Sequence, residues 1–374
     1  MAISTGERFE ATLAKVRQEI ADHLHEIGLM PEAVDRVTQV CTMLKRLKTL
    51  FASLTFGKCL FTNTSGGNQL RGRSVLDTGS ILNGHDLTTT QIEELLVLGS
   101  LIEFFHAAYV VWDDIMDGST TRRGQPCWYC RESVGMAAIN DACLLKSVIG
   151  VILKKRFRDH PAYVDFIELF SEASLRTELG QHCDLMASTN LLRLDQFNWD
   201  KYDFITANKT AYYSVYVPLT IPHLYLGLAT PKKLGKLYEV SMMFGLICQA
   251  RDDVLDVYGD PLDTGKIGTD IQENKCTWLS VEALQHCDVE QKRVLENCYG
   301  SQEREDILKV QAVFEELNLV KLFGNWDKEM LAKLDTVIEQ VSKEAGLKKE
   351  IFSGLVSKYF ADPRKSLPWS GNGP

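Results

Sequence analysis

Apolar residues recur at intervals of three and four along most of the chain, which is the spacing of amphipathic α-helices. The first such segment places apolar side chains at Phe9, Leu13, Val16 and Ile20. We find no convincing run of the alternating apolar and polar residues that mark a half-buried strand. The pattern therefore predicts an all-α protein.

The predicted helices are separated by segments in which Gly, Pro, Ser, Thr or Asn interrupt the apolar spacing. They cover approximately residues 9–27, 31–54, 70–82, 91–117, 136–155, 161–188, 197–206, 209–228, 232–258, 271–285, 288–298, 303–318, 321–345 and 348–360. Glycines and prolines punctuate the chain without forming a linker, and we see no repeat. We expect one all-α domain over residues 1–374 whose long helices surround a central cavity, with a flexible tail at 362–374.

Bulk composition excludes several classes of protein. The net charge of -9 argues against a nucleic-acid partner, because no basic stretch offsets it. No apolar run reaches the roughly 20 residues that span a bilayer. The N-terminal residues lack the apolar core of a secretion signal. Together with ten scattered cysteines, interpreted as reduced thiols, these features predict a cytoplasmic protein without a membrane span.

Three carboxylates end a long apolar helix, an arrangement that is electrostatically costly. Asp113, Asp114 and Asp117 follow the apolar run 96–111. Like charges one helical turn apart repel, and removing them from water costs more. A cation would offset that cost, and positions i and i+4 share one helix face, so Asp113 and Asp117 can reach the same ion. All-oxygen ligation suits Mg²⁺, which often bridges carboxylates to phosphates.

The same arrangement recurs later in the chain, where Asp252, Asp253 and Asp256 end the apolar helix that begins near residue 232. One such motif fits an ordinary solvated helix end, but two copies, each followed by cations, favour a site. We expect two acidic helices that face each other across a cavity and hold Mg²⁺ against a diphosphate. Lys209 and Thr210 begin a further predicted helix, where a lysine and backbone N–H groups favour an anion.

Five segments, in this order, resemble the trans-isoprenyl diphosphate synthase family and in particular eukaryotic farnesyl diphosphate synthases. They are GG-x-x-x-RG at residues 66–72, DDIMDGSTTRRGQPCWY at 113–129, GQ-x-x-DL at 180–185, KTAYYS at 209–214 and DDVLDVYGDP-x-x-TGKIGTDIQENKC at 252–276. The last is highly specific. The resemblance spans most of the chain and implies an isoprenoid-synthase-type helical bundle around a central cavity, assembled as a homodimer.

The resemblance also assigns roles to individual residues. It implies three Mg²⁺ ions that draw charge from a leaving diphosphate, so that the allylic carbon–oxygen bond ionises. The implied metal ligands are Asp113, Asp117 and Asp252, supported by Asp114, Asp184 and Asp256. The implied diphosphate-binding residues are Arg122, Lys209, Lys266, Gln249 and Thr210.

The segments that bind isopentenyl diphosphate in this family differ in this chain. Asn68 stands where the family has a lysine, and His106 and Arg251 each stand where it has a glutamine. Arg71 and Arg123 of the same site remain. A charge-assisted hydrogen bond contributes roughly 1.5–3 kcal/mol, so losing the lysine weakens binding of this substrate.

This loss suggests an enzyme that ionises farnesyl diphosphate but no longer extends it. The leading hypothesis is therefore a Mg²⁺-dependent sesquiterpene synthase, whose cation would cyclise or rearrange in an aromatic pocket. The candidate pocket residues are Phe105, Ala108, Tyr109, Tyr213 and Phe244. Ala108 is smaller than the bulky residue often found there, which favours a C15 chain over C10.

Two alternatives stay open. The chain can be a farnesyl or geranyl diphosphate synthase that condenses dimethylallyl or geranyl diphosphate with isopentenyl diphosphate. It can also be a silent partner subunit of an active prenyltransferase, although the intact aspartates and lysines speak against that.

Overall fold

The computed structural model describes residues 4–27, 59, 62–64, 69–188, 193–361 and 367. The prediction of an all-α protein is confirmed: the described residues form helices, apart from loops and the two-residue strands β1 (Thr121–Arg122) and β2 (Gln125–Pro126). The chain divides into two compact units. Unit 1 comprises Met1–Thr120, Gln125–Ser171 and Val217–Ala229, and unit 2 comprises Thr121–Gly124, Glu172–Tyr216 and Thr230–Pro374.

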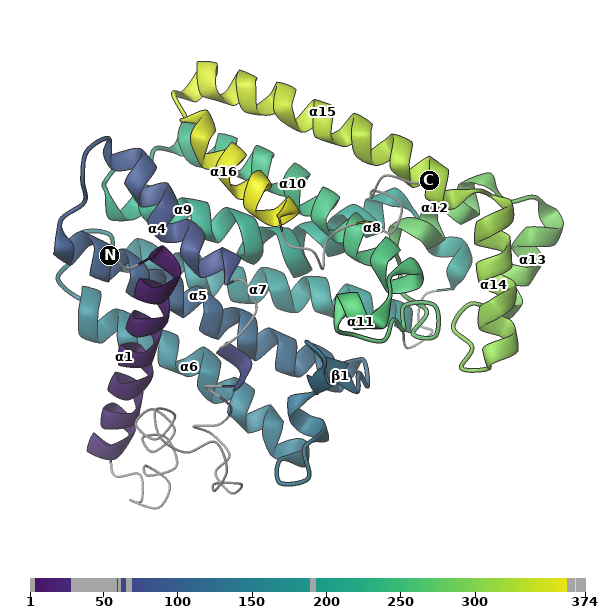
Figure 1. Ribbon diagram of the computed structural model, residues 1–374, viewed down its shortest axis with the longest axis horizontal. Coiled ribbons are helices and arrows are strands. Elements are labelled where there is room, and N and C mark those ends of the chain that lie inside the picture. Colours follow the sequence, from purple (N-terminus) through teal and green to yellow (C-terminus); the bar gives the residue numbers. More distant parts are fainter. Residues whose placement is uncertain are drawn as a thin grey trace. The chain divides into compact units, whose positions relative to one another are not determined.

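In unit 1 the helix α5 is the centre of the packing. It contacts α1, α4, α6 and α9, as Figure 1 shows around its blue ribbon. The helices of this unit are α1 (Thr5–Glu26), α4 (Leu70–Asn83), α5 (Thr89–Met116), η1 (Trp128–Cys130), η2 (Gly135–Ala137), α6 (Ala138–Phe157), the first part of α7 (Tyr163–Ser188) and α9 (Val217–Tyr225). The acidic motif at residues 113–117 thus ends the central helix of the unit.

The start of α5 is set by a capping box. The Thr88 hydroxyl accepts from the Gln91 backbone N–H, and the Gln91 side chain accepts in return from the N–H of Thr88. This exchange satisfies donors that a helix start leaves without partners. Residues 95–111 are all buried except His106 and Val110, which makes α5 a core helix.

Two helices of the described chain are long and apolar enough to cross a membrane by length and composition, although the sequence pattern predicted none. In α5, 83% of the apolar window is buried inside the structure, as expected for the core helix of a folded domain. In the segment Gly135–Phe157, which includes α6, only 44% is buried. The α6 segment therefore keeps an apolar face that unit 1 does not cover.

Two glycines let α4 and α5 cross at close range. A Cβ atom added to Gly99 would lie 2.3 Å from the carbonyl oxygen of Gly72, which no real contact allows. The close approach also lets the Gly72 N–H donate to the buried Glu103 carboxylate at 2.8 Å. The crossing fixes the helix that ends in the first acidic motif.

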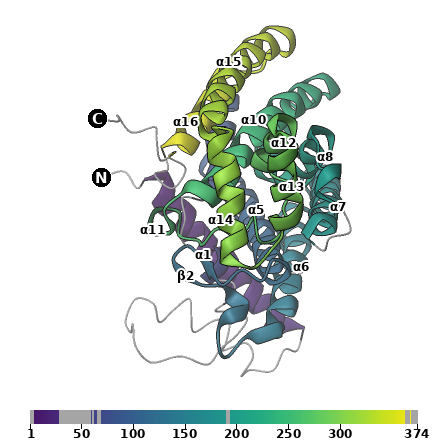
Figure 2. The ribbon, with the colours of Figure 1, turned by 90° about the vertical axis from the view of Figure 1, so that its right-hand side faces the viewer.

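In unit 2 the helix α10 (Pro231–Tyr258) has the central place, and it contacts η4, α12 and α15. The other elements are β1, the second part of α7, η3 (Leu194–Gln196), α8 (Trp199–Ile205), η4 (Thr206–Tyr216), α11 (Pro261–Thr264), α12 (Trp278–His286), α13 (Val289–Cys298), α14 (Arg304–Glu316), α15 (Leu319–Ala345) and α16 (Lys349–Phe360). The helices α13 and α14 lie side by side, as Figures 1 and 2 both show.

An aromatic cluster forms much of the core of unit 2. Trp278 is fully buried, with Phe323 at 4.9 Å and Trp326 at 5.7 Å between ring centroids. Trp199 stacks on Trp326 at 6.4 Å. Edge and offset contacts of this kind add to the free energy gained by burial. The cluster ties α8, α12 and α15 together beside the acidic end of α10.

Most predicted helix ranges are confirmed, but the prediction for residues 271–285 is wrong in its first half. Residues 271–274 form turns and residues 275–277 are loop, because Asn274 has a left-handed backbone with φ of 51°, which a helix cannot continue. The helix α12 begins only after Thr277, whose hydroxyl caps the Ser280 N–H.

Some sequence predictions fall on residues that are not described. The predicted helix at 31–54 lies outside the described residues, as does the tail at 362–374 except for Leu367, which is buried. Residues 62–64, predicted as loop, are helical. The predictions of a single domain and of a central cavity stay predictions.

We expect Gly99→Ala to destabilise the protein by about 1–3 kcal/mol, the usual cost of overpacking a core. The added methyl group would force α4 and α5 apart. As a control, Gly235→Ala in α10 adds a methyl group where no atom lies within 4 Å, and it should be neutral or stabilising by up to about 1 kcal/mol. Urea denaturation of both variants measures this difference, and equal stability would contradict the close crossing.

Candidate functional site

The first acidic motif lies at the end of α5. Asp117 caps the helix, and its N–H donates to the Asp113 carbonyl at 2.8 Å. Asp114 is buried at 2% exposure, whereas Asp113 and Asp117 are half-buried. Because Asp113 and Asp117 are four residues apart on a helix, their carboxylates share one side, as the sequence predicted.

Aromatic rings fill the α5 face that precedes this motif. The Phe105 and Tyr109 rings lie 4.5 Å apart between centroids, and the Trp112 ring lies 5.2 Å from that of Tyr109. The Lys146 ammonium lies 5.7 Å from the centroid of the Tyr109 ring. Ala108, also on α5, is fully buried. Unit 1 therefore brings together three of the predicted pocket residues.

Lys209 and Thr210 lie within a π-helical stretch, η4, which continues directly from α8 and into α9. The prediction that a helix begins at Lys209 is therefore wrong, and free N–H groups of a helix start do not act there. Two glycines hold the wide turn: a Cβ on Gly180 would meet the Lys209 nitrogen at 2.2 Å, and one on Gly245 would meet the Ala211 Cβ at 2.1 Å. Such π-turns occur frequently at functional sites.

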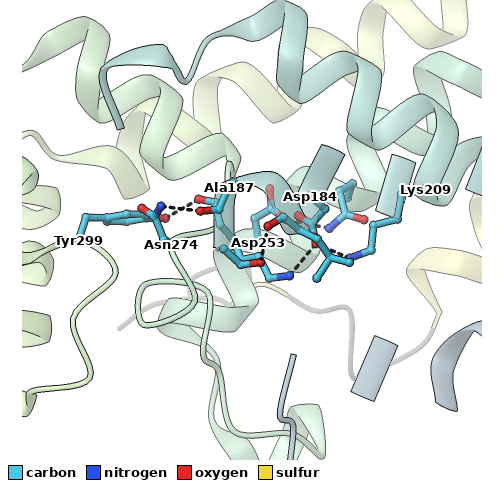
Figure 3. A network of polar contacts seen from close by, with 10 residues as sticks. Asp184, Ala187, Lys209, Asp253, Asn274 and Tyr299 are labelled. Atoms are coloured by element: carbon cyan, nitrogen blue, oxygen red, sulfur yellow. Dashed lines mark hydrogen bonds and ion pairs between the residues drawn. The ribbon is translucent and has the colours of Figure 1, made fainter. Parts of the chain in front are cut away.

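A buried carboxylate holds two lysines in this region. Asp184 on α7 accepts from Lys209 Nζ at 2.7 Å and from Lys275 Nζ at 2.6 Å, both through Oδ2 (Figure 3). The Asp184 and Lys275 side chains are 6% and 7% exposed. Burial opposes the charged carboxylate, but the two ammonium groups outweigh it and hold the pKa of Asp184 below its usual value. The cluster carries one net positive charge.

Lys275 is a site residue that the sequence reasoning did not assign. Its backbone is held on both sides: the Tyr299 hydroxyl donates to the Lys275 carbonyl at 2.8 Å, and the Asn274 amide donates to the Ala187 carbonyl at 2.8 Å (Figure 3). The left-handed backbone of Asn274 turns the chain so that Lys275 reaches Asp184. Its place in the specific motif at residues 252–276 was the available signal.

The second acidic motif ends α10, and its buried member is Asp253. It accepts from the Tyr202 hydroxyl at 2.6 Å, from Gln249 Nε2 at 2.8 Å and from the Trp278 N–H at 2.9 Å. Burial raises the pKa of Asp253 to about 6 despite these donors. Gln249 also accepts from the Thr210 hydroxyl at 2.8 Å, which links this motif to the π-helix.

Asp256 holds the lysine of the following loop. It accepts from Lys266 Nζ at 2.6 Å and from the Asp270 N–H at 2.9 Å. Burial disfavours the ammonium, but Asp256 and Asp270 outweigh it and raise the pKa of Lys266, so this lysine stays charged. A Cβ on Gly268 would lie 1.8 Å from the Asp256 carbonyl oxygen, so only glycine allows this loop to pack on α10.

The arginine turn at residues 122–124 lies beside this lysine loop. The Gly124 N–H donates to the Gly265 carbonyl at 2.8 Å. The positive charge of Arg122 is close enough to oppose the rise in the pKa of Lys266. Unit 2 therefore groups Arg122 and Lys266 at the end of α10, as a site for an anion requires.

The residues predicted for the isopentenyl diphosphate site, and the remaining two pocket residues, are spread over both units. Arg71 and His106 are half-buried on α4 and α5 in unit 1, and Arg123 is exposed with φ of 55° in unit 2. Tyr213 and Phe244 are buried in η4 and α10. Asn68 lies outside the described residues.

The donors at the acidic motifs fit Mg²⁺ by their chemistry, because each motif offers carboxylate oxygens one helical turn apart. Among the described residues, no three His, Cys, Asp or Glu side chains converge into a ready metal cluster. A hard cation with only two protein carboxylates completes its shell with water and phosphate oxygens. The motifs thus suit a metal that arrives with a phosphorylated ligand.

Comparison with known proteins gives a consistent result. Residues 55–317 match the family model described as "Polyprenyl synthetase". The farnesyl pyrophosphate synthase of Schizosaccharomyces pombe is 39% identical over 96% of this chain and 98% of its own length. That of Bos taurus is 36% identical over 93% of this chain and 96% of its own. The Trypanosoma brucei farnesyl diphosphate synthase complexed with risedronate superposes with a TM-score of 0.84, at 27% identity over 96% of this chain and 99% of that one.

These findings overturn the hypothesis of a terpene synthase. Relatives that match almost the whole chain are named as farnesyl pyrophosphate synthases, and they support prenyl chain elongation. The hypothesis gave too much weight to the substitution at position 68, because one charge-assisted hydrogen bond of roughly 1.5–3 kcal/mol changes an affinity, not a reaction class. The chain belongs to the polyprenyl synthetase family of isoprenyl diphosphate synthases.

Proposed function

We propose that the protein is a prenyltransferase that condenses an allylic diphosphate with isopentenyl diphosphate and yields farnesyl diphosphate. The observation that carries this proposal is the pair of lysines, Lys209 and Lys275, held on Asp184 beside the acidic end of α10. A diphosphate leaving group requires such fixed cations. The names of the relatives support the substrate class.

In the proposed reaction the carbon–oxygen bond of the allylic diphosphate breaks, and its electron pair leaves with the diphosphate. Lys209, Lys266 and Lys275 stabilise the charge that develops on the leaving oxygens. The double bond of isopentenyl diphosphate then forms a carbon–carbon bond with the allylic carbon, and the resulting cation gives a proton to the released diphosphate. We assign Mg²⁺ to Asp113 and Asp117 in the first motif and to Asp252 in the second; when bound, it neutralises the diphosphate as a Lewis acid.

For the second substrate we propose Arg71 of unit 1, one of the two arginines of that site that the sequence retains; His106 takes the place of the family's glutamine. Asn68 in place of lysine lowers the affinity for isopentenyl diphosphate without removing the reaction. The buried ring of Tyr109, packed between Phe105 and Trp112, would limit the length of the growing chain and favours a C15 product.

We also propose that the protein is a homodimer that pairs through α6. Some exposed positions of this segment follow one helical stripe of apolar and small residues. The stripe consists of Met136, Ile139, Cys143, Ser147 and Gly150. A second copy of the chain that presents the same stripe would bury it, since symmetric dimers use one patch twice.

We expect the purified protein to convert geranyl and isopentenyl diphosphates to farnesyl diphosphate with Mg²⁺, and to lose this activity with EDTA. The products are identified by mass spectrometry after phosphatase treatment. Farnesyl diphosphate alone should give no hydrocarbon, because the proposed enzyme elongates prenyl chains and does not convert them to terpenes. Absence of a longer diphosphate, with the protein folded and metal present, would contradict the proposal and favour the silent-partner alternative.

For the dimer, Ile139→Glu should shift the protein from dimer to monomer in sedimentation analysis, because it places a charge in the stripe. The matched control is Glu132→Gln, which changes an exposed charge outside α6. A dimer that persists in Ile139→Glu at micromolar concentration would show that α6 is not the interface.

A further inference from the structure

The last described helix, α16, ends against the second acidic motif. The Tyr359 hydroxyl lies 3.2 Å from the Cys248 carbonyl oxygen and 3.4 Å from Asp252 Oδ1. Its ring meets Phe244 edge-on at 5.6 Å between centroids. Phe244, Cys248 and Asp252 are four residues apart, so they form one face of α10. Tyr359 therefore lies along that face, with its hydroxyl at the carboxylate.

A buried ion pair fixes the neighbouring residue. Arg251 donates twice to Asp327 on α15, from Nε to Oδ1 at 2.7 Å and from Nη2 to Oδ2 at 2.5 Å. The Arg251 guanidinium carbon also lies 4.1 Å from the centroid of the Phe360 ring. Arg251 and Asp327 are 8% and 5% exposed. Paired in this way, Arg251 acts as an anchor for the end of α16.

The two sets of contacts place Tyr359 where it can orient a metal ligand. A hydroxyl has one proton, and a charged carboxylate is a stronger acceptor than a carbonyl. The Cys248 carbonyl keeps the hydroxyl within reach of Asp252. A tyrosine hydroxyl carries its proton at neutral pH, so it can act as the donor. Tyr359 is not among the residues to which we assign Mg²⁺.

We propose that Tyr359 is a positioning residue for Asp252: its hydroxyl holds the carboxylate in the orientation that binds Mg²⁺, and the Arg251–Asp327 pair with Phe360 holds Tyr359. The proposal rests on the proposed function, which makes Asp252 a metal ligand. Partners behind a metal ligand typically change metal affinity by about 10–100-fold. Because 3.4 Å is a long hydrogen bond, the expected effect is at the lower end of that range.

The test is Tyr359→Phe, which removes one oxygen atom and keeps the ring. Binding of Mn²⁺ is measured by electron paramagnetic resonance in the presence of inorganic pyrophosphate. We expect the dissociation constant for Mn²⁺ to rise about tenfold. The Mg²⁺ concentration that gives half-maximal activity should rise in parallel, while the KM for isopentenyl diphosphate stays unchanged.

The matched control is Tyr225→Phe, which removes a hydroxyl that donates to the Glu94 carboxylate in unit 1. It should leave Mn²⁺ binding unchanged. A dissociation constant within twofold of the unsubstituted protein for Tyr359→Phe, or an equal shift in Tyr225→Phe, would overturn the proposal.

A second variant tests the anchor. Phe360→Leu removes the ring beneath Arg251 and leaves Tyr359 intact, so Mn²⁺ affinity should fall by a smaller factor, about threefold. No change would show that Tyr359 does not need the anchor. The Mn²⁺ measurement does not depend on prenyl transfer. If the unsubstituted protein does not elongate prenyl chains but Tyr359→Phe raises the Mn²⁺ dissociation constant as expected, only the proposed function is refuted. If the protein elongates prenyl chains but the dissociation constant does not rise, only this inference is refuted.

Discussion

The carboxylate of Asp184 is the feature on which the arrangement of unit 2 depends. It is buried in α7 and receives ammonium groups from the π-helix and from the loop that precedes α12. A buried charge without a partner is strongly unfavourable, whereas a fully hydrogen-bonded cluster is tolerated. The carboxylate thus allows the buried Lys275 and the half-buried Lys209 to lie on the same oxygen atom. In the proposed reaction those lysines bind the leaving diphosphate. The Asp184 carboxylate therefore serves both the folding of unit 2 and the proposed catalysis.

The backbone around this cluster is built to bring the charges together. Gly180 and Gly245 allow the π-helix to approach α7 and α10 more closely than any side chain would permit. The left-handed turn at Asn274 carries Lys275 back to Asp184. A second ion pair lies at the end of α10, between Asp256 and Lys266. Lys209, Lys266 and Lys275 are therefore each held by a carboxylate before any ligand binds.

The fold was largely predictable from the sequence, since apolar spacing alone placed most helices. The acidic motifs were predictable because carboxylates at i and i+4 share one face of a helix, and at the end of an apolar helix this arrangement favours a cation site. The π-helix was not, because its wide turns depend on glycines of two other helices that are distant in sequence. Lys275 was not assigned, because its contact with Asp184 joins residues 91 positions apart. The role of Arg251 as an anchor depends on Asp327, 76 positions away, which no local pattern reveals.

Substitutions inferred from a family pattern were the weakest evidence for activity. Asn68, His106 and Arg251 together suggested a lost substrate, yet Arg251 proves to be one half of a buried ion pair. A residue that departs from a motif can serve packing as readily as chemistry, and only its partner shows which.

The most direct test of the central claim is the free energy of unfolding of Asp184→Asn in urea at pH 7. The substitution removes the charge that pairs with the buried Lys275 ammonium and the half-buried Lys209 ammonium, so we expect the free energy of unfolding to fall by about 3–5 kcal/mol. The exposed pair of Glu339 and Lys349 provides the comparison, and Glu339→Gln should cost no more than about 1 kcal/mol. A loss for Asp184→Asn no larger than that of Glu339→Gln would contradict the account.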